Sequence, residues 1–215
     1  MGKKVILLST TYLPPISYFA AIAWADMVEL EVQETYPKQT YRNRCHIYSP
    51  NGLQALSLPI NKPYGNHTKT NQVTISNHIN WKNIHWRSLE AAYNSSPFFI
   101  YYRDQLEADY NRQVESLLEF NHNILKTLLK MIGLNAEICY LDVYTKNPEK
   151  VVDLRNAIHP KKPVSQVFKN HEYTQVFAQK HGFLPDLSIV DLLFNVGPAA
   201  AGYLQQFANL IPKTY

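Results

Sequence analysis

The polar run Tyr41-Arg42-Asn43-Arg44 contains the residue types of this chain that best suit ligand chemistry. If the run is a β-strand, Arg42 and Arg44 share one face, and Tyr41 and Asn43 share the other. Two guanidinium groups on one face would clamp a phosphate or a carboxylate through paired hydrogen bonds, which arginine does better than lysine. A pair of solvent-exposed arginines on a strand is the plainer alternative. The run is therefore a candidate anion site.

Three side chains elsewhere in the chain are candidates for acid–base chemistry. His85 precedes Trp86 in a helical pattern, where it acts as an acid or base or packs as a half-buried histidine. Asp191 stands beside apolar leucines, and a partly buried carboxylate there needs a cationic partner such as His181 or one of the arginines. The plainer interpretation of Asp191 is a capping box, in which Ser188 is the N-cap of a helix.

The hydroxyl-rich loop Ser9–Pro15 follows the first predicted strand, where α/β sheets tend to bind ligands. A turn that caps a helix explains it equally well. The chain has no GxGxxG or GxxxxGK[ST] phosphate loop, and no GxSxG or HExxH signature. Its two cysteines, Cys45 and Cys139, are far apart and show no metal-ligand spacing. We therefore expect no cofactor and no metal.

Length and composition predict a single domain spanning residues 1–215. The 15 tyrosines are a clear excess, and such enrichment usually reflects core packing, although a surface that stacks sugars or nucleotides is the alternative. The net charge of +4 is mild and its basic residues are scattered, with local pairs at Lys3-Lys4 and Lys161-Lys162. A nucleic-acid binder would show a basic stripe, so we expect no nucleic-acid partner. The charge is compatible with an anionic ligand.

The chain start predicts neither a signal peptide nor a membrane anchor. The apolar run Val5–Leu8 follows two lysines, as in a signal peptide, but it stops after four residues. No stretch approaches the roughly 20 apolar residues of a membrane span. We expect a cytoplasmic protein with reduced thiols, and its oligomeric state is left open.

The first half of the chain must position the arginine run, and its pattern predicts strands around one short helix. Strand, helix and strand in this order predict a parallel βαβ start. Asn51-Gly52 supplies the positive φ of a tight turn and predicts an antiparallel hairpin around it. The expected segments are the strand Val5–Leu8, the helix Tyr18–Ala25, the strand Met27–Val32, the hairpin strands His46–Tyr48 and Leu53–Ile60, and the strand Val73–Ile75.

The second half of the chain is predicted to be mainly helical. Together with the first half, this gives a mixed α/β (α+β) fold with a βαβ-like N-terminus, a central antiparallel hairpin and a helical C-terminal half. The expected segments are the helix Trp81–Tyr93, a helix that begins with Ser96 as N-cap and Pro97 as its first residue, the helix Arg112–Ile132 capped by Gly133, the strand Ala136–Leu141, the strand or loop Val151–His159, and the helices Tyr173–Gln179, Ser188–Phe194 and Ala199–Ala208.

Several stretches in the same order resemble the WbqC-like family of bacterial proteins. They are Tyr12-Leu13-Pro14-Pro15 with Tyr18-Phe19, Asp26, Gln33 with Asn43-Arg44, Leu56–Ile60, His85–Leu89 with Tyr93 and Pro97–Phe99, and Phe183–Pro185 with Leu187–Asn195 and Gly197-Pro198. There are two departures. Ser9–Thr11 stands where relatives often have His-Gln-Pro, and Asp153–Pro163 replaces a Tyr-Leu-Ser-Gly segment.

The resemblance implies a role among proteins of O-antigen and other surface polysaccharides, and a suggested glycine transfer to sugars. The resulting hypothesis is a cytoplasmic group transferase that uses a sugar or nucleotide-sugar, and the alternative is a non-catalytic module that binds a sugar or a protein partner. The base would be His85, His181 or Asp191. The candidate ligand-binding residues are Tyr12, Tyr18, Tyr41, Asn43, Arg44, Trp86 and Asn195. Asn43 and Arg44 would serve one site only if the strand bends.

Overall fold

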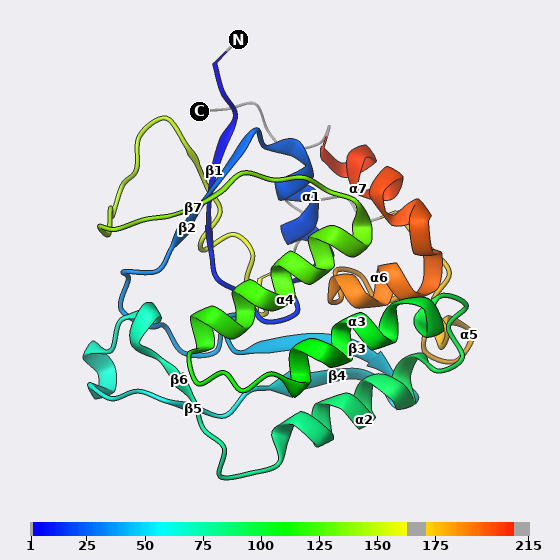
Figure 1. Cartoon of the computed structure of the whole chain (residues 1–215). Helices are drawn as coiled ribbons and strands as arrows, with labels where there is room; N and C mark the ends of the chain where they lie inside the picture. Colours follow the sequence, from blue (N-terminus) through cyan, green and yellow to red (C-terminus); the bar gives the residue numbers. More distant parts are fainter. Residues whose placement is uncertain (1, 163–170, 209–215) are drawn as a thin grey trace.

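The computed structural model describes residues 2–162 and 171–208, and a parallel sheet lies at the upper left of the molecule in Figure 1. Its strand order is β7-β2-β1-β8, and all of its pairs are parallel. The βαβ start is confirmed, because a helix, α1, connects β1 to β2. These elements are β1 (Val5–Ser9), α1 (Ile16–Trp24), β2 (Met27–Glu31), β7 (Ile138–Tyr140) and β8 (Val152–Asp153).

The predicted antiparallel hairpin lies across the lower half of the molecule (Figure 1). It consists of β3 (Arg44–Ser49) and β4 (Gly52–Ser57), which pair antiparallel. Gly52 has a φ of 95°, which confirms the expected turn. The next loop contains two 3-10 turns, Gly65–His67 and Thr70–Gln72, between the paired strands β5 (Ile60–Asn61) and β6 (Thr74–Ile75).

Most of the remaining chain is helical, as predicted. Ser116 caps the longest helix by accepting a hydrogen bond from the Glu119 amide at 3.3 Å, and Gly133 ends it with a φ of 78°. The helices are α2 (Trp81–Tyr93), α3 (Phe99–Asn111), α4 (Leu117–Ile132), α5 (Ala178–His181), α6 (Ile189–Val196) and α7 (Ala200–Ala208), with a 3-10 turn at Gly197–Ala199.

Three predicted helix boundaries are wrong. Ser96 and Pro97 do not start α3, because the Phe98 amide donates to the Phe194 carbonyl at 3.0 Å and the helix begins after it. The segment 112–116 is extended, since Glu115 accepts from the Ile75 amide at 2.7 Å and residue 116 bridges to β6. The predicted helix Tyr173–Gln179 forms only from residue 178 onward.

The tyrosine excess belongs largely to the core. The most buried tyrosines expose at most 2% of their surface and are Tyr12, Tyr18, Tyr48, Tyr93 and Tyr110. The hairpin packs against α2, and Cys45 and Ile47 on one face of β3 are fully buried. Within residues 2–162 and 171–208, no helix is both long and apolar enough to cross a membrane.

Gly197 offers a test of this packing. It has a φ of 58°, and a Cβ atom there would lie 2.5 Å from the Phe98 ring. Gly197→Ala should therefore lower the free energy of unfolding by more than about 2 kcal/mol, since strain and overpacking add. Gly133→Ala is the matched control: its φ is also positive, but nothing lies within 4 Å of the added atom. Urea denaturation of both variants should show the larger loss for Gly197→Ala, and equal losses would contradict this packing.

Candidate functional site

The carboxyl ends of the parallel strands meet at one edge of the sheet, which we call the carboxyl edge. Arg155 anchors it after β8. Its Nη1 lies 3.4 Å from Glu31 at the end of β2, and its Nη2 lies 2.6 Å from Asp153. Arg155 also donates to the carbonyl of Thr145 at 3.0 Å. The Arg155 side chain is 4% exposed and Glu31 is fully buried, so this group holds the strand ends together.

Arg42 is a second buried arginine at the carboxyl edge. Its Nε donates to Glu34 at 2.9 Å, and its Nη2 contacts both Glu34 and Ser9. The Asn121 side chain donates to the Arg42 carbonyl at 2.9 Å. Arg42 lies in a turn before β3 and not on a strand. The predicted clamp of Arg42 and Arg44 on one strand face is therefore wrong, because Glu34 neutralises Arg42 inside the protein.

Arg44, the first residue of β3, differs from Arg42 in its hydrogen bonds and ion pairs. Its Nε is buried and has no hydrogen-bond partner within the described residues, and the buried hydroxyl of Tyr36 is in the same condition. Arg42 and Arg44 are both close enough for their charges to act on the Tyr36 hydroxyl. No carboxylate of the described chain forms an ion pair with Arg44. Buried unpaired donors are rare in native proteins and call for a ligand or water.

Basic residues from two segments, one of them β3 with Arg44, act on two histidines. His46 lies two residues along β3, so its side chain shares a strand face with Arg44. Burial lowers the pKa of His46, and Arg44 lowers it further. Burial also lowers the pKa of His159, and the charged groups that add to this effect are all basic: Lys162, Arg42, Lys161 and Arg44. We call Arg44, His46, His159, Lys161 and Lys162 the basic cluster.

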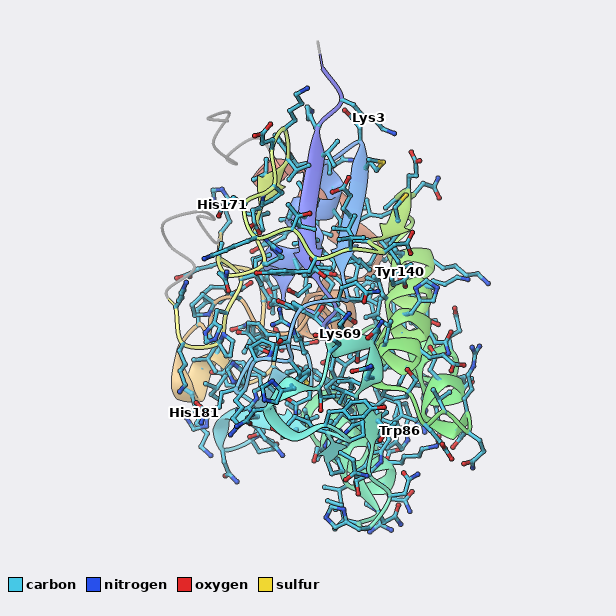
Figure 2. All side chains as sticks on the ribbon, turned by 90° about the vertical axis from the view of Figure 1, so that its left-hand side faces the viewer. Lys3, Lys69, Trp86, Tyr140, His171 and His181 are labelled. Atoms are coloured by element: carbon cyan, nitrogen blue, oxygen red, sulfur yellow. The ribbon has the colours of Figure 1, made fainter. Side chains whose placement is uncertain are left out.

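A cavity of about 630 Å³ opens at the carboxyl ends of β2 and β7. This volume falls within the range of roughly 300–1,000 Å³ that is usual for small-molecule sites. Glu34 lines the cavity and also binds Arg42, so the cavity lies next to the arginine turn. The guanidinium carbon of Arg155 lies over the Tyr144 ring, 5.5 Å from the ring centroid. The lining residues are Gln33, Glu34, Thr35, Lys69, Asp142, Val143 and Tyr144. Figure 2 labels Lys69 in the view that faces this side of the molecule.

Three of the predicted site residues form part of the interior. The Tyr12 hydroxyl lies 2.8 Å from Nδ1 of His85 and also contacts the Tyr110 hydroxyl. Burial lowers the pKa of His85 to about 4, so its ring is neutral at neutral pH. The Trp86 ring packs 5.7 Å from that of Tyr110. This arrangement suits packing better than proton transfer with a ligand.

Three other predicted residues lie near the arginine turn. The Tyr18 hydroxyl donates to the Ser9 carbonyl at 3.1 Å. The ring of Tyr41 lies edge-on to that of His46, with centroids 5.6 Å apart. The Asn43 side chain donates to the Leu58 carbonyl at 2.9 Å and so fixes the start of the hairpin. Asn43 lies in a bend directly before β3, but its side-chain amide is bound to Leu58 and not shared with Arg44.

Asp191 is fully buried in a network of neutral donors. Its Oδ2 accepts from the Tyr173 hydroxyl at 2.5 Å and from Gln175 at 3.0 Å. Burial raises the pKa of Asp191 to about 6, although these hydrogen bonds oppose the rise. The predicted capping box is wrong, because Ser188 makes no side-chain cap. No cation among the described residues forms an ion pair with Asp191, so neither His181 nor an arginine is the expected partner there. Asn195 donates to the Asp191 carbonyl at 2.7 Å, one helical turn away.

His181 lies at the opposite end of β3 from Arg44. Its Nε2 is 2.9 Å from the carbonyl of Pro50 in the hairpin turn, and its ring is exposed (Figure 2). His85, His181 and Asp191 therefore have separate surroundings, and their catalytic role stays a prediction. Sequence reasoning missed the histidines of the basic cluster. The spacing of two residues between Arg44 and His46 in a predicted hairpin strand was the available signal.

Within the described residues, no group of three or more His, Cys, Asp or Glu side chains is arranged to hold a metal ion. The family model described as the WbqC-like protein family matches residues 10–167. The chain is also similar to "Uncharacterized protein Rv1507c" of Mycobacterium tuberculosis (strain ATCC 25618 / H37Rv), with 27% identity over 230 residues that cover 94% of this chain and 98% of that protein. No solved structure matches the chain.

The Asp191 network predicts a specific pH dependence of stability. Its pKa rises from 3.8 to about 6 on folding, so the folded state binds more protons than the unfolded state between these values. Stability should fall as pH increases from 4 to 6, by on the order of 2 kcal/mol from this group. Asp191→Asn should match the wild type near pH 4 and exceed it at neutral pH.

Denaturant unfolding at several pH values would measure this difference. Asp104→Asn is the control, because the Asp104 side chain is 90% exposed. Parallel curves for the wild type and Asp191→Asn would show that the Asp191 carboxyl is not held in its neutral form.

Proposed function

The chain belongs to the WbqC-like family, and on this basis we propose that it is a cytoplasmic group transferase of surface-polysaccharide biosynthesis. Its ligand is an anionic sugar, such as a nucleotide-sugar, bound at the carboxyl edge of the parallel sheet. The acceptor is a hydroxyl or amino group of the sugar, and the transferred group is an acyl group, for example an aminoacyl group from an activated carrier.

The observation that carries this proposal is that Arg44 has no ion-pair partner within residues 2–162 and 171–208. A buried guanidinium nitrogen without a partner, beside an equally unpaired Tyr36 hydroxyl, forms a ready pair of hydrogen-bond donors. His159, Lys161 and Lys162 add positive charge from the segment after β8. A phosphate or carboxylate would satisfy the donors and neutralise the charge at the same time.

The neighbouring cavity suits the sugar part of such a ligand. Asp142, Gln33 and Lys69 supply acceptors and donors for hydroxyl groups, and Tyr144 supplies an aromatic face. Ligands of α/β sheets usually bind beyond the carboxyl ends of the strands, which is where this cavity opens.

Proton transfer is assigned to the histidines of the basic cluster. As the acyl group moves from its carrier to the sugar, the attacking hydroxyl or amine loses one proton and the carrier leaves with the electron pair of the broken acyl bond. A neutral imidazole can accept that proton and pass it to the leaving carrier. His46 and His159 have lowered pKa values and are only partly buried, so both are neutral and reachable at neutral pH. The second candidate function is binding without catalysis. It is favoured by the separate surroundings of His85, His181 and Asp191.

Replacing Arg44 tests the anion site. Arg44→Gln should weaken binding of a nucleotide-sugar about 10- to 100-fold, because a charge-assisted hydrogen bond contributes about 1.5–3 kcal/mol. Isothermal titration calorimetry with UDP-, GDP- and dTDP-linked hexoses, and with pyrophosphate as a minimal anion, would measure the change.

Arg87→Gln is the matched control, because Arg87 is exposed on α2 and its loss changes the net charge equally. The melting temperature of both variants should stay near that of the wild type. If no anion binds the wild type, or if Arg44→Gln only destabilises the fold, the site is not at Arg44. Binding of a nucleotide-sugar without acyl transfer to it from any aminoacyl donor would favour the non-catalytic function.

The basic cluster also predicts that binding depends on pH. Neighbouring positive charges depress the pKa of His159, and a bound anion would offset them and raise it. Protons are then taken up on binding, so affinity should increase as pH falls from the raised pKa of His159 in the complex to its lowered pKa in the free protein. The increase is about tenfold for each unit by which the pKa rises. NMR titration of the histidine rings, with and without pyrophosphate, would measure the pKa of His159, and an unchanged value would place the anion elsewhere.

A further inference from the structure

A groove of about 730 Å³ lies between α4 and the edge of the parallel sheet at β7. It shares no lining residue with the cavity at the carboxyl edge. Its apolar floor comes from the end of α4 and from the chain that leads into β7: Leu129, Leu134, Ala136 and Ile138. The groove is therefore a second surface, separate from the proposed substrate site.

One wall of the groove is basic. His122, Lys126 and Lys130 recur every fourth residue along α4 and so form one stripe. Burial and Lys126 lower the pKa of His122, and its Nδ1 contacts the Tyr140 hydroxyl, so the charge of the stripe comes from the two lysines. Lys126 and Lys130 are exposed, and no carboxylate of the described residues pairs with either. The acidic residue of the groove, Glu137, already accepts a hydrogen bond from Lys3 at 2.9 Å. The groove thus presents positive charge beside an apolar floor.

The open edge of β7 borders this groove. The Val28 amide donates to the Glu137 carbonyl at 2.8 Å, and the Leu141 amide donates to the Leu30 carbonyl at 3.0 Å. Backbone groups alternate in direction along a strand, so those of Ile138 and Tyr140 point away from β2. Because β7 ends the described strand order, these groups form an unpaired edge. In Figure 2, Tyr140 lies between the blue strands and the green helices.

We propose that this groove binds an extended acidic segment of a partner protein, which adds to β7 as a further strand. The backbone of the segment would bond to the free groups of Ile138 and Tyr140. Its side chains alternate between the two faces of the sheet, and one set would face α4. Apolar side chains of that set would contact the floor, and carboxylates would contact Lys126 and Lys130.

Charge complementarity selects this occupant over a second copy of the chain. A symmetric pair of β7 edges would bring two identical basic stripes together, and like charges repel. The chain itself carries a net charge of +4. An anionic lipid would meet the lysines but would leave the backbone donors of β7 unused. An acidic strand would pair with the lysines, cover the apolar floor and bond to the free backbone groups of β7.

The test uses the full chain and a short peptide of alternating valine and glutamate. Cys139 is exposed on β7 and Cys45 is buried, so a thiol-reactive fluorophore would label Cys139 and report binding. In ¹⁵N-labelled protein, the peptide should shift the amide signals of Ile138 and Tyr140 and slow their hydrogen exchange about tenfold or more. Lys126→Gln/Lys130→Gln should weaken binding about tenfold, and Lys62→Gln/Lys180→Gln should not.

Two control peptides separate strand addition from simple charge attraction. A valine–lysine peptide should not bind, and a valine–glutamate peptide with alternate N-methylated amides should bind at least about tenfold more weakly, since it lacks strand donors. Equal binding of the methylated peptide would overturn the proposal. Displacement of the peptide by phosphatidylglycerol vesicles would also overturn it. So would a dimer of the chain, detected by analytical ultracentrifugation, that prevents the peptide from binding. Arg44→Gln should leave this binding unchanged, which keeps the result independent of the proposed function.

Discussion

The buried guanidinium group of Arg155 is the contact on which the carboxyl edge depends. It joins Glu31 after a separation of 124 residues and holds Asp153 at the end of β8. β8 pairs with β1 through only two residues, Ile6 and Leu7, so its ladder alone is weak. Removing one partner of such a buried ion pair typically costs about 3–5 kcal/mol, because the other charge is left uncompensated. This contact, with the Leu154 amide that donates to the Leu7 carbonyl at 2.9 Å, positions the segment that carries His159.

Arg42 and Arg44 are separated by one residue but differ in their partners. The guanidinium group of Arg42 donates hydrogen bonds to Glu34 and Ser9, so Arg42 has a structural role beside the cavity. Arg44 has no such partner within the described residues, although the hairpin holds its backbone in register with Ser57. A charged side chain that folding holds in place but does not neutralise is preorganised for a ligand. The conformational entropy of ordering it is then lost during folding and not on binding. The proposed anion site therefore relies on the pairing of Arg42 as much as on the freedom of Arg44.

Local signals in the sequence predicted the elements well, whereas long-range contacts decided the site. The turn at Asn51-Gly52 and the helix Trp81–Tyr93 depend on neighbouring residues, and both were predicted correctly. The helix α4 begins later than predicted because Ser116 bridges to β6 and holds the preceding segment extended. No local sequence pattern indicates this contact. The partners of Asp191 come from Tyr173 and Gln175, more than ten residues away, so a local capping box was the wrong choice. The role of Arg44 stays a prediction. The spacing between Arg44 and His46 was a local signal, whereas the placement of His159 required the folded chain.

Burial decides which histidine can exchange protons with a ligand. His85 is 4% exposed, its Nδ1 is engaged by Tyr12, and its pKa near 4 keeps it neutral over the physiological range. A proton would have to pass through a packed core of aromatic rings to reach it. His46 and His159 are neutral for a related reason, but they remain partly exposed beside Arg44. The tyrosine network around His85 then contributes indirectly, because the rigid hairpin that it supports fixes the direction of Arg44 and His46.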